Sequence, residues 1–181
     1  MLDAVGAIAA ARPSLPILAD SRRSLRDYPS VGLKMNRAEL ALLLGVDELD
    51  DLEAVRSAAA ELARRDGRPV IVTLAEQGLL GAEPEGRLFH FEALPRRGEI
   101  DIVGAGDSVT ANLTTALAAG ATLAESLQLA NVAASIVIHQ LGTTGAATVA
   151  EIEQVLRELL ETWLNGKVVL HQGPPREEDA C

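Results

Sequence analysis

Two kinds of segment alternate along the first half of the chain, and this alternation limits the folds that it can adopt. Short apolar runs, bounded by turn residues as buried strands are, occupy residues 15–19, 31–34 and 69–74. Amphipathic or alanine-rich stretches of helix length occupy residues 2–11, 36–44 and 47–66. Strands that alternate with helices predict a mostly parallel sheet covered on both faces, so we expect a three-layer α/β/α fold.

The second half of the chain predicts a hairpin followed by three helices. Residues 79–82 and 87–92 flank a Pro- and Gly-containing turn, a pattern typical of antiparallel strands. The helices are expected to begin at Asp107, Thr122 and Thr148. The last two of these residues are each followed, three residues later, by glutamate, which is the spacing of a capping box. The last helix is expected to bury a face that consists of Ile152, Val155, Leu156, Leu159, Leu160 and Trp163.

The extent of the domain also follows from these patterns. Residues 166–181 contain two prolines and an acidic run, so we expect a disordered tail after a domain portion at residues 1–165. Sheets of this kind usually have about five or more strands. Only three or four parallel strands are evident before the hairpin, which indicates that the chain is part of a larger domain.

Composition excludes several functions. The formal net charge is −10 and aromatic residues make up 2% of the chain, which argues against nucleic acid as a partner. Cys181 is the only cysteine and the three histidines stand apart, so neither an intrachain disulfide nor a zinc site is expected. No apolar run reaches about 18 residues and no signal peptide is evident, so we expect no membrane partner and a cytoplasmic location.

The stretch Asp101-Ile-Val-Gly-Ala-Gly-Asp-Ser108 is the most informative part of the sequence. Its small residues let a ligand approach the backbone, and the unpaired amides of the helix that follows predict an anion site. A carboxylate at the start of that helix, such as Asp107, is favourable by about 0.3–1 kcal/mol. A general base for an attacking hydroxyl is also expected beside a phosphate. Local chemistry leaves helix stabilisation and catalysis equally open for Asp107.

Three further groups of residues suit a nucleotide, although each has an ordinary structural explanation. Asn36 and Glu39 fit a plain helix cap, which is the more common case, or a Mg²⁺ and phosphate site. Thr73 ends a predicted strand and Gly78 follows in a turn, an arrangement that can hold phosphates or simply reverse the chain. Asn131 lies among small residues that allow close approach by a flat ring or, more commonly, by another helix.

Together, these stretches resemble in order and spacing the C-terminal half of the ribokinase-like carbohydrate kinase family, also called the PfkB family. Gly104-Ala-Gly-Asp107, with Asp101 ahead of it, resembles the second signature of that family, and Asn36-x-x-Glu39 resembles its Asn-x-x-Glu motif. Residues 73–78 are similar to its Thr-x-Gly-x-x-Gly nucleotide turn, and residues 129–143 are similar to its helix beside the adenine and the loop after it.

The resemblance covers about residues 1–160 and implies a reaction. The run Asp107-Ser-Val-Thr and the stretch 142–148 are most similar to the branch that phosphorylates heptose phosphates. The implied activity is transfer of the γ-phosphoryl group of ATP to a hydroxyl of a sugar or sugar-phosphate substrate, with Mg²⁺ and, as a further cofactor, K⁺.

The resemblance also implies a role for each matching residue. Asp107 is expected to be the catalytic base. The expected anion hole is formed by Gly104, Ala105 and Gly106 with the amide of Asp107. Nucleotide contacts are expected from Asn36, Thr73, Gly78 and Asn131. Glu39 is expected to hold Mg²⁺ through water, Asp101 to hold a monovalent cation with carbonyl groups of the 138–143 loop, and Lys34 to reach a phosphate.

Three features depart from the family pattern. Ala75 occupies a glycine position of the nucleotide turn, which costs about 1 kcal/mol or more if the backbone there has a positive φ. Ile102 and Val103 replace a threonine-rich lead-in. The family's N-terminal half, with its lid and most sugar contacts, has no counterpart. We therefore expect a truncated or split member that binds nucleotide weakly alone and pairs with a chain that supplies the missing half or with a second copy.

Two other interpretations compete with the kinase. A catalytically inactive nucleotide-binding or structural remnant fits Ala75 and the missing half, whereas the retained Asp107 argues against a loss of chemistry. An NAD-binding Rossmann domain fits poorly, because no Gly-x-Gly-x-x-Gly motif follows the first predicted strand.

Overall fold

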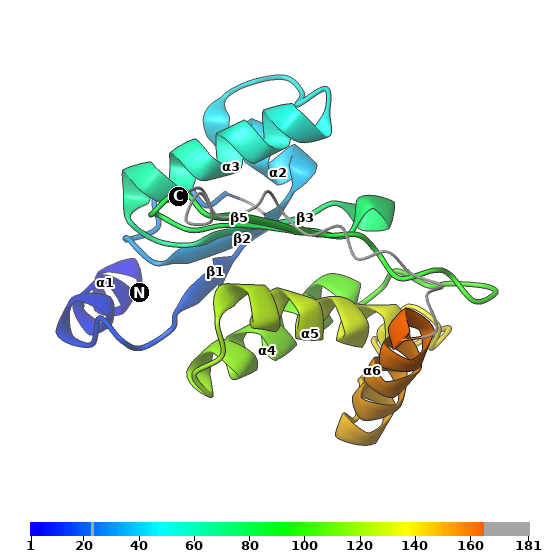
Figure 1. The fold of residues 1–181 in the computed structure, drawn as a ribbon. Helices are drawn as coiled ribbons and strands as arrows, with labels where there is room; N and C mark the ends of the chain where they lie inside the picture. The colour runs from blue at the N-terminus through cyan, green and yellow to red at the C-terminus, as the bar shows by residue number, and fades with distance from the viewer. Residues whose placement is uncertain (23, 165–181) are drawn as a thin grey trace, which may run out of the picture.

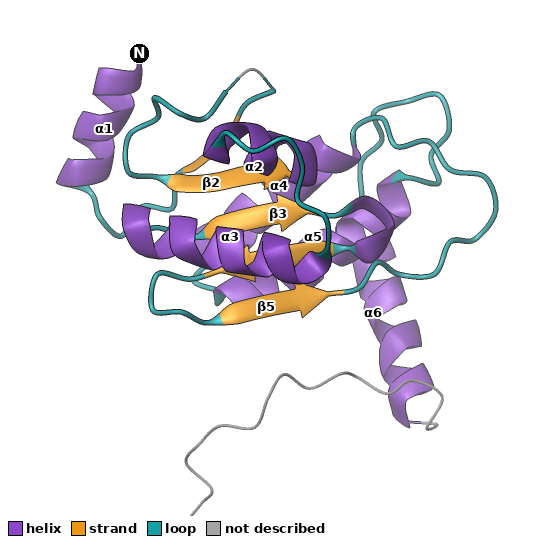
Figure 2. Cartoon of the chain, turned by 90° about the horizontal axis from the view of Figure 1, so that it is seen from above, coloured by secondary structure: helices purple, strands orange, loops and turns teal. Residues whose placement is uncertain are grey.

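A single mixed sheet organises the computed structural model, which describes residues 1–22 and 24–164. Its strands follow the chain order, β1 (Leu18–Asp20), β2 (Gly32–Asn36), β3 (Val70–Thr73), β4 (Leu79–Ala82) and β5 (Leu88–Phe91). The first three strands are parallel, and the last two continue the sheet as an antiparallel hairpin (Figure 2). The register places Asp20 beside Lys34, and Asn36 beside Thr73.

Helices cover both faces of this sheet, which confirms the three-layer prediction (Figure 1). One face is covered by α2 (Arg37–Leu44) and α3 (Leu52–Asp66), and the other by α4 (Ala105–Ala118) and α5 (Leu123–Val137). The remaining helices are α1 (Leu2–Ala11), near the β1 edge, and α6 (Val149–Leu164), which packs against α5. No helix in the described ranges combines the length and hydropathy that a membrane span requires.

The central strand β3 explains the two-sided core. Val70 and Val72 join the apolar cluster under α2 and α3, whereas Ile71 joins the cluster under α4 and α5. All three side chains are at most 1% exposed. A strand buried on both faces reads as a continuous apolar run, which is why the segment before Thr73 could be identified from sequence.

Several element boundaries differ from the prediction, and the reason is clear for two of them. The helix expected from Asp47 begins at Leu52, because the Asp51 carboxylate accepts the Ala54 amide at 2.7 Å and caps the helix instead. Asp47 and Asp51 have the same capping chemistry, so sequence cannot choose between them. The first strand begins at Leu18 rather than at residue 15, after a turn in which the Leu15 amide donates to the Arg12 carbonyl.

The capping boxes at Thr122 and Thr148 are confirmed. The Glu125 carboxylate accepts the Thr122 amide at 2.8 Å, and Glu151 accepts the Thr148 amide at the same distance. The face predicted for α6 is only partly correct, because Ile152 is buried while Leu160 is 58% exposed. The predicted tail at 166–181 and the side chain of Trp163 lie outside the described residues.

Removing the Thr122 hydroxyl tests the cap of α5. We expect Thr122→Ala to lower the melting temperature by about 2–4 °C near pH 7. Hydrogen bonds from the Thr122 hydroxyl and amide lower the pKa of Glu125 below its ordinary value of 4.5. The ionised carboxylate therefore stabilises the folded chain above about pH 4.5, and this contribution is lost as the pH falls through the lowered pKa.

Calorimetry across this pH range should show that the melting temperatures of Thr122→Ala and the parent become more similar as the pH falls. Thr115→Ala is the matched control, because the Thr115 hydroxyl donates to the Ala111 carbonyl and contacts no titratable group in the described part of the chain. If the difference in melting temperature between Thr122→Ala and the parent stays constant as the pH falls, the Thr122 hydroxyl stabilises the helix independently of the Glu125 charge.

Candidate active site

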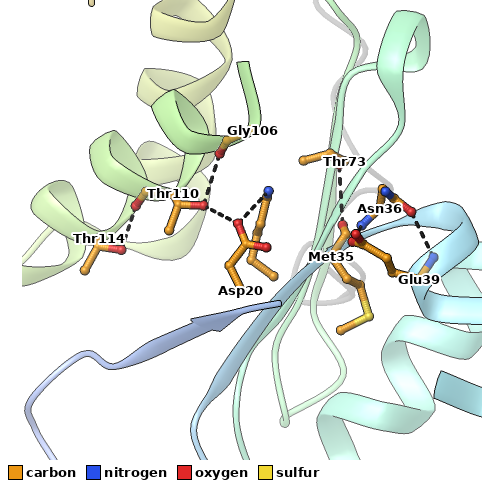
Figure 3. Close-up of polar contacts among 9 residues, drawn as sticks. Asp20, Met35, Asn36, Glu39, Thr73, Gly106, Thr110 and Thr114 are labelled. Atoms are coloured by element: carbon orange, nitrogen blue, oxygen red, sulfur yellow. Dashed lines mark hydrogen bonds and ion pairs between the residues drawn. The ribbon is translucent and has the colours of Figure 1, made fainter. Parts of the chain in front are cut away.

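The carboxyl ends of the parallel strands meet the start of α4 at one edge of the sheet (Figure 3). Asp20 ends β1, Asn36 ends β2 and Thr73 ends β3. The Asp20 side chain contacts α4 through the Thr110 hydroxyl, which donates to its carboxylate at 2.9 Å. The structure therefore brings residues from four separate elements to the same edge, where open α/β sheets place their ligands.

Helix α4 begins with a glycine that no other residue can replace without strain. Gly104 is the N-cap of α4 and has φ +82°. A Cβ atom built on Gly104 would lie 2.1 Å from the Thr144 carbonyl oxygen, so both the backbone angle and the close approach require glycine. The helix begins without a side-chain cap, which leaves its first amides to other acceptors.

Two of the three predicted anion-hole amides are unbonded within the described residues. The amides of Gly106 and Asp107 have no acceptor there, whereas the Ala105 amide donates to the Ile102 carbonyl at 3.2 Å. Free amides at a helix start, aligned with the positive end of the helix dipole, form a binding place for an anion.

Asp107 is the third residue of α4 and is exposed. Its carboxylate forms no hydrogen bond or ion pair with any residue that the structure describes. The helix starts two residues earlier than predicted, so Asp107 does not cap it. Of the structural explanations for this acid, only its favourable interaction with the helix dipole remains.

An ion pair between a buried lysine and a more exposed aspartate lies against this helix start. The Lys34 ammonium is 2.9 Å from the Asp20 carboxylate, and Lys34 as a whole is 6% exposed. A Cβ atom built on Gly106 would lie 3.1 Å from Lys34 Nζ, so the ammonium lies against the first turn of α4. The Thr110 hydroxyl bridges the pair to the helix, with its oxygen also 3.1 Å from the Gly106 carbonyl.

Asn36 and Glu39 form the capping box of α2. The Asn36 side-chain oxygen accepts the Glu39 amide at 2.8 Å, and the Glu39 carboxylate accepts the Asn36 amide at 2.7 Å (Figure 3). The structural explanation for both residues is therefore present. Thr73 lies beside Asn36 in the sheet, and its hydroxyl is 3.5 Å from the Met35 carbonyl.

The turn after β3 has a strained alanine. Ala75, the first residue of η1 (Ala75–Gln77), has φ +51°, so the glycine position of the family motif does require a left-handed backbone. Gln77 fixes this turn, because its side chain accepts the Arg37 guanidinium and its carbonyl contacts His90 Nε2 at 2.8 Å. Gly78 has φ +87° and packs against the Phe91 carbonyl.

Replacing Ala75 with glycine should stabilise the chain. The left-handed backbone costs alanine about 1–2 kcal/mol, and the greater freedom of unfolded glycine offsets part of the gain. We expect Ala75→Gly to raise the melting temperature by about 1–3 °C, measured by calorimetry. Ala119→Gly, at an exposed residue with φ −79°, is the control and should lower it. A loss of stability in both variants would rule out strain at Ala75.

Asp101 joins the loop before α4 to the loop after α5. Its carboxylate accepts the Val103 amide at 2.9 Å and the Gly142 amide at 3.1 Å, and its own amide donates to the Ile138 carbonyl. The structure thus brings Asp101 to the 138–143 loop, as predicted. His139 adds a second link, since its Nε2 accepts the Arg97 amide at 2.9 Å.

Asn131, in α5, is buried. Its side-chain amide donates to the Glu92 carbonyl at 2.7 Å. The same 91–93 segment touches Gly78, so Asn131 and Gly78 contact one piece of backbone. No contact in the described ranges links Asn131 to Asn36 or Thr73.

Sequence reasoning missed Asp20 and Thr110. A signal was present for each: Asp20 directly follows the strand predicted at residues 15–19, and Thr110 lies one helical turn after Gly106. Neither signal is specific, because many strands end in a charge and many helices contain threonine.

The three layers, together with a glycine-started helix at the carboxyl edge of parallel strands, define a ribokinase-like α/β protein. The chain belongs to the pfkB family of carbohydrate kinases, whose model matches residues 9–150. The resemblance inferred from the sequence motifs is therefore confirmed.

Two curated relatives are similar to this chain over part of their own length. The bifunctional protein HldE of Azorhizobium caulinodans is 37% identical to it, over 97% of this chain and 36% of its own length. The HldE of Paramagnetospirillum magneticum is 42% identical, over 61% of this chain and 22% of its own length. The chain spans about a third of the length of the first relative.

Solved structures show the same fold. Phosphofructokinase-2 from Escherichia coli in complex with potassium has a TM-score of 0.63 and 28% identity, over 71% of this chain and 41% of its own. Ribokinase from Arabidopsis thaliana, complexed with ribose and ATP, has a TM-score of 0.71 over 83% of this chain and 50% of its own. At 23% identity, the second similarity supports the fold alone.

Proposed function

We propose that the chain binds ATP and transfers its γ-phosphoryl group to a hydroxyl of a sugar or sugar phosphate. One observation supports this most strongly: the Asp107 carboxylate lacks a partner among the described residues and shares the first turn of α4 with two unbonded amides. Family membership supplies the reaction class. We further propose that residues 1–165 form the nucleotide-binding portion of the kinase and that it acts in the cytoplasm.

In the proposed reaction, Asp107 takes the proton from the attacking hydroxyl. The hydroxyl oxygen forms a bond to the γ-phosphorus while the bond from that phosphorus to the bridging oxygen breaks, and ADP leaves. The amides of Gly106 and Asp107 stabilise the charge on the transferred group, with Gly104 setting the turn and Ala105 the helix start. The protein contributes position and charge rather than covalent chemistry.

The donor set around Asn36 fits a Mg²⁺ ion held through water. The described residues contain no cluster of three or more His, Cys, Asp or Glu side chains suited to a metal. Mg²⁺ keeps several waters and binds phosphate oxygens, so the Glu39 carboxylate and the Asn36 side-chain oxygen suffice to orient its water shell. When bound, Mg²⁺ neutralises charge on the nucleotide phosphates.

The remaining assignments are proposals of the same kind. Thr73, Gly78 and Asn131 contact the nucleotide. Asp101 anchors the loops whose backbone carbonyls hold a monovalent cation, and the potassium complex of phosphofructokinase-2 supports K⁺ as that ion. We propose that a partner chain or a second copy completes the sugar site.

Incubating the chain with labelled ATP, Mg²⁺ and a panel of sugars and sugar phosphates tests the proposed function. We expect label transfer to a sugar phosphate when a partner chain that completes the sugar site is added, little transfer by the chain alone, and weak Mg-ATP binding by the chain in calorimetry. Binding without transfer to any acceptor would favour a non-catalytic nucleotide-binding module. Absence of Mg-ATP binding would contradict the proposal.

Losing both oxygen donors at the start of α2 should weaken Mg-ATP binding. Asn36→Ala with Glu39→Ala removes a capping box, so about 0.5–2 kcal/mol of stability is lost as well. Asp51→Ala removes the cap of the neighbouring α3 and serves as the control. Calorimetry should show that both variants melt earlier while only the double variant binds Mg-ATP more weakly. If the double variant and Asp51→Ala bind Mg-ATP with equal affinity, Asn36 and Glu39 act only as a cap.

A further inference from the structure

We infer that Asp20 and Thr110 are positioning residues that hold the Lys34 ammonium where the transferred phosphoryl group binds. This inference rests on the proposed function and adds to it. Asp20, at the end of β1, supplies the carboxylate that pairs with the Lys34 ammonium, and Thr110, 90 positions later in α4, donates to that carboxylate (Figure 3). The argument depends on burial, on the sign of the charge and on the hydrogen bonds of the pair.

The Lys34 side chain is buried, and its ammonium lacks a full set of acceptors among the described residues. Its side chain is 7% exposed, and an ammonium has three N–H donors. Within the described ranges, only the Asp20 carboxylate accepts from it, at 2.9 Å. A buried charged group with unused donors is costly unless a further acceptor binds, and phosphate oxygens are suitable acceptors.

The position of this cation is electrostatically unfavourable for the protein alone. Lys34 Nζ lies against Gly106, in the first turn of α4, where the helix dipole is positive and the amides of Gly106 and Asp107 are unbonded. A cation is normally favourable at the opposite end of a helix. An anion bound here would satisfy the ammonium and the amides together, so the arrangement suits a ligand better than it suits the free fold.

Asp20 and Thr110 explain how the ammonium stays in this place. Asp20 offsets part of the positive charge, and the Thr110 hydroxyl donates to the same carboxylate oxygen at 2.9 Å. A carboxylate fixed from two sides limits the positions of the lysine side chain, which otherwise has four flexible methylenes. Preorganised charge is worth more than mobile charge when a phosphoryl group transfers.

The ratio of the dissociation constants for Mg-ADP and Mg-ATP tests this inference, since only ATP carries the γ-phosphoryl group. Thr110→Val removes the hydroxyl without changing a charge, and we expect it to lower the preference for ATP about threefold to tenfold. Thr110→Ser should restore the preference. Thr114→Val is the matched control, because the Thr114 hydroxyl donates to the Thr110 carbonyl one turn along the same helix and does not contact Asp20.

Two charge variants complete the experiment, which uses calorimetry on the full chain. Lys34→Met combined with Asp20→Asn keeps the site neutral and should abolish the ATP preference while Mg-ADP still binds. Asp20→Asn alone should lower the preference, and Asp20→Glu should restore part of it. An unchanged or increased ATP preference in Thr110→Val or Asp20→Asn would overturn the positioning role, with Mg-ADP binding showing that the proposed nucleotide site stands. A parent chain that binds neither nucleotide would overturn the proposed function and this inference together.

Discussion

Asp107→Asn should lower the rate of phosphoryl transfer by about 10²–10⁴-fold, the usual contribution of a general base, when the chain is assayed with the partner that completes the sugar site. The asparagine has the same size and keeps the first turn of α4 intact, so the melting temperature should change little. Affinity for Mg-ATP should hold or rise, because one negative charge beside the bound phosphates is removed. A fall in rate without a fall in affinity is characteristic of a group that acts in the transition state.

Two measurements on each protein separate catalysis from helix stabilisation: transfer of labelled phosphate and calorimetric Mg-ATP affinity. Asp3→Asn is the control, since Asp3 is also an exposed acid in the first turn of a helix, α1. If Asp107 served only the helix dipole, both variants would lose a little stability and neither would change transfer or affinity. Turnover of Asp107→Asn within a few-fold of the parent would remove the central residue of the kinase proposal.

The features that could be predicted from sequence are those with a local signal. Capping boxes depend on a spacing of three residues, so Thr122 and Thr148 were identified correctly. The buried strand β3 could be recognised because both of its faces are apolar. The family motif has glycine at position 75, which raised the question of a left-handed backbone there, and the structure places Ala75 at φ +51°.

The features that could not be predicted depend on tertiary contacts. The pair of Asp20 and Lys34 exists only because β1 and β2 lie in register, and Thr110 joins it across 90 positions of sequence. The nearness of Asp101 to the 138–143 loop was expected only from the family resemblance, because its contact with Gly142 spans 41 positions and has no local signal. Such contacts depend on the register of strands and the placing of helices, which no single segment encodes.

The same distinction applies to position 104, which requires glycine for one local and one tertiary reason. Its φ of +82° is a local cost for any other residue, about 1–2 kcal/mol. The Thr144 carbonyl oxygen, 2.1 Å from a Cβ built on Gly104, adds a tertiary cost. Displacing a backbone carbonyl in a packed loop costs about 1–3 kcal/mol more, so Gly104→Ala should destabilise the chain by about 2–5 kcal/mol.

Gly98→Ala isolates the local part of this effect, because Gly98 lies in the same connection with φ +93° and has nothing within 4 Å of its Cβ position. Calorimetry should show that Gly98→Ala loses only the local part of the stability, whereas Gly104→Ala should lower the melting temperature about 1.5 to 4 times as far. Gly104→Ala should also weaken Mg-ATP binding, since moving the 144 backbone shifts the first amides of α4, and Gly98→Ala should not. Equal losses of stability in the two variants would show that the loop around Thr144 yields freely, and the start of α4 would then not be the preorganised anion site that the proposed reaction needs.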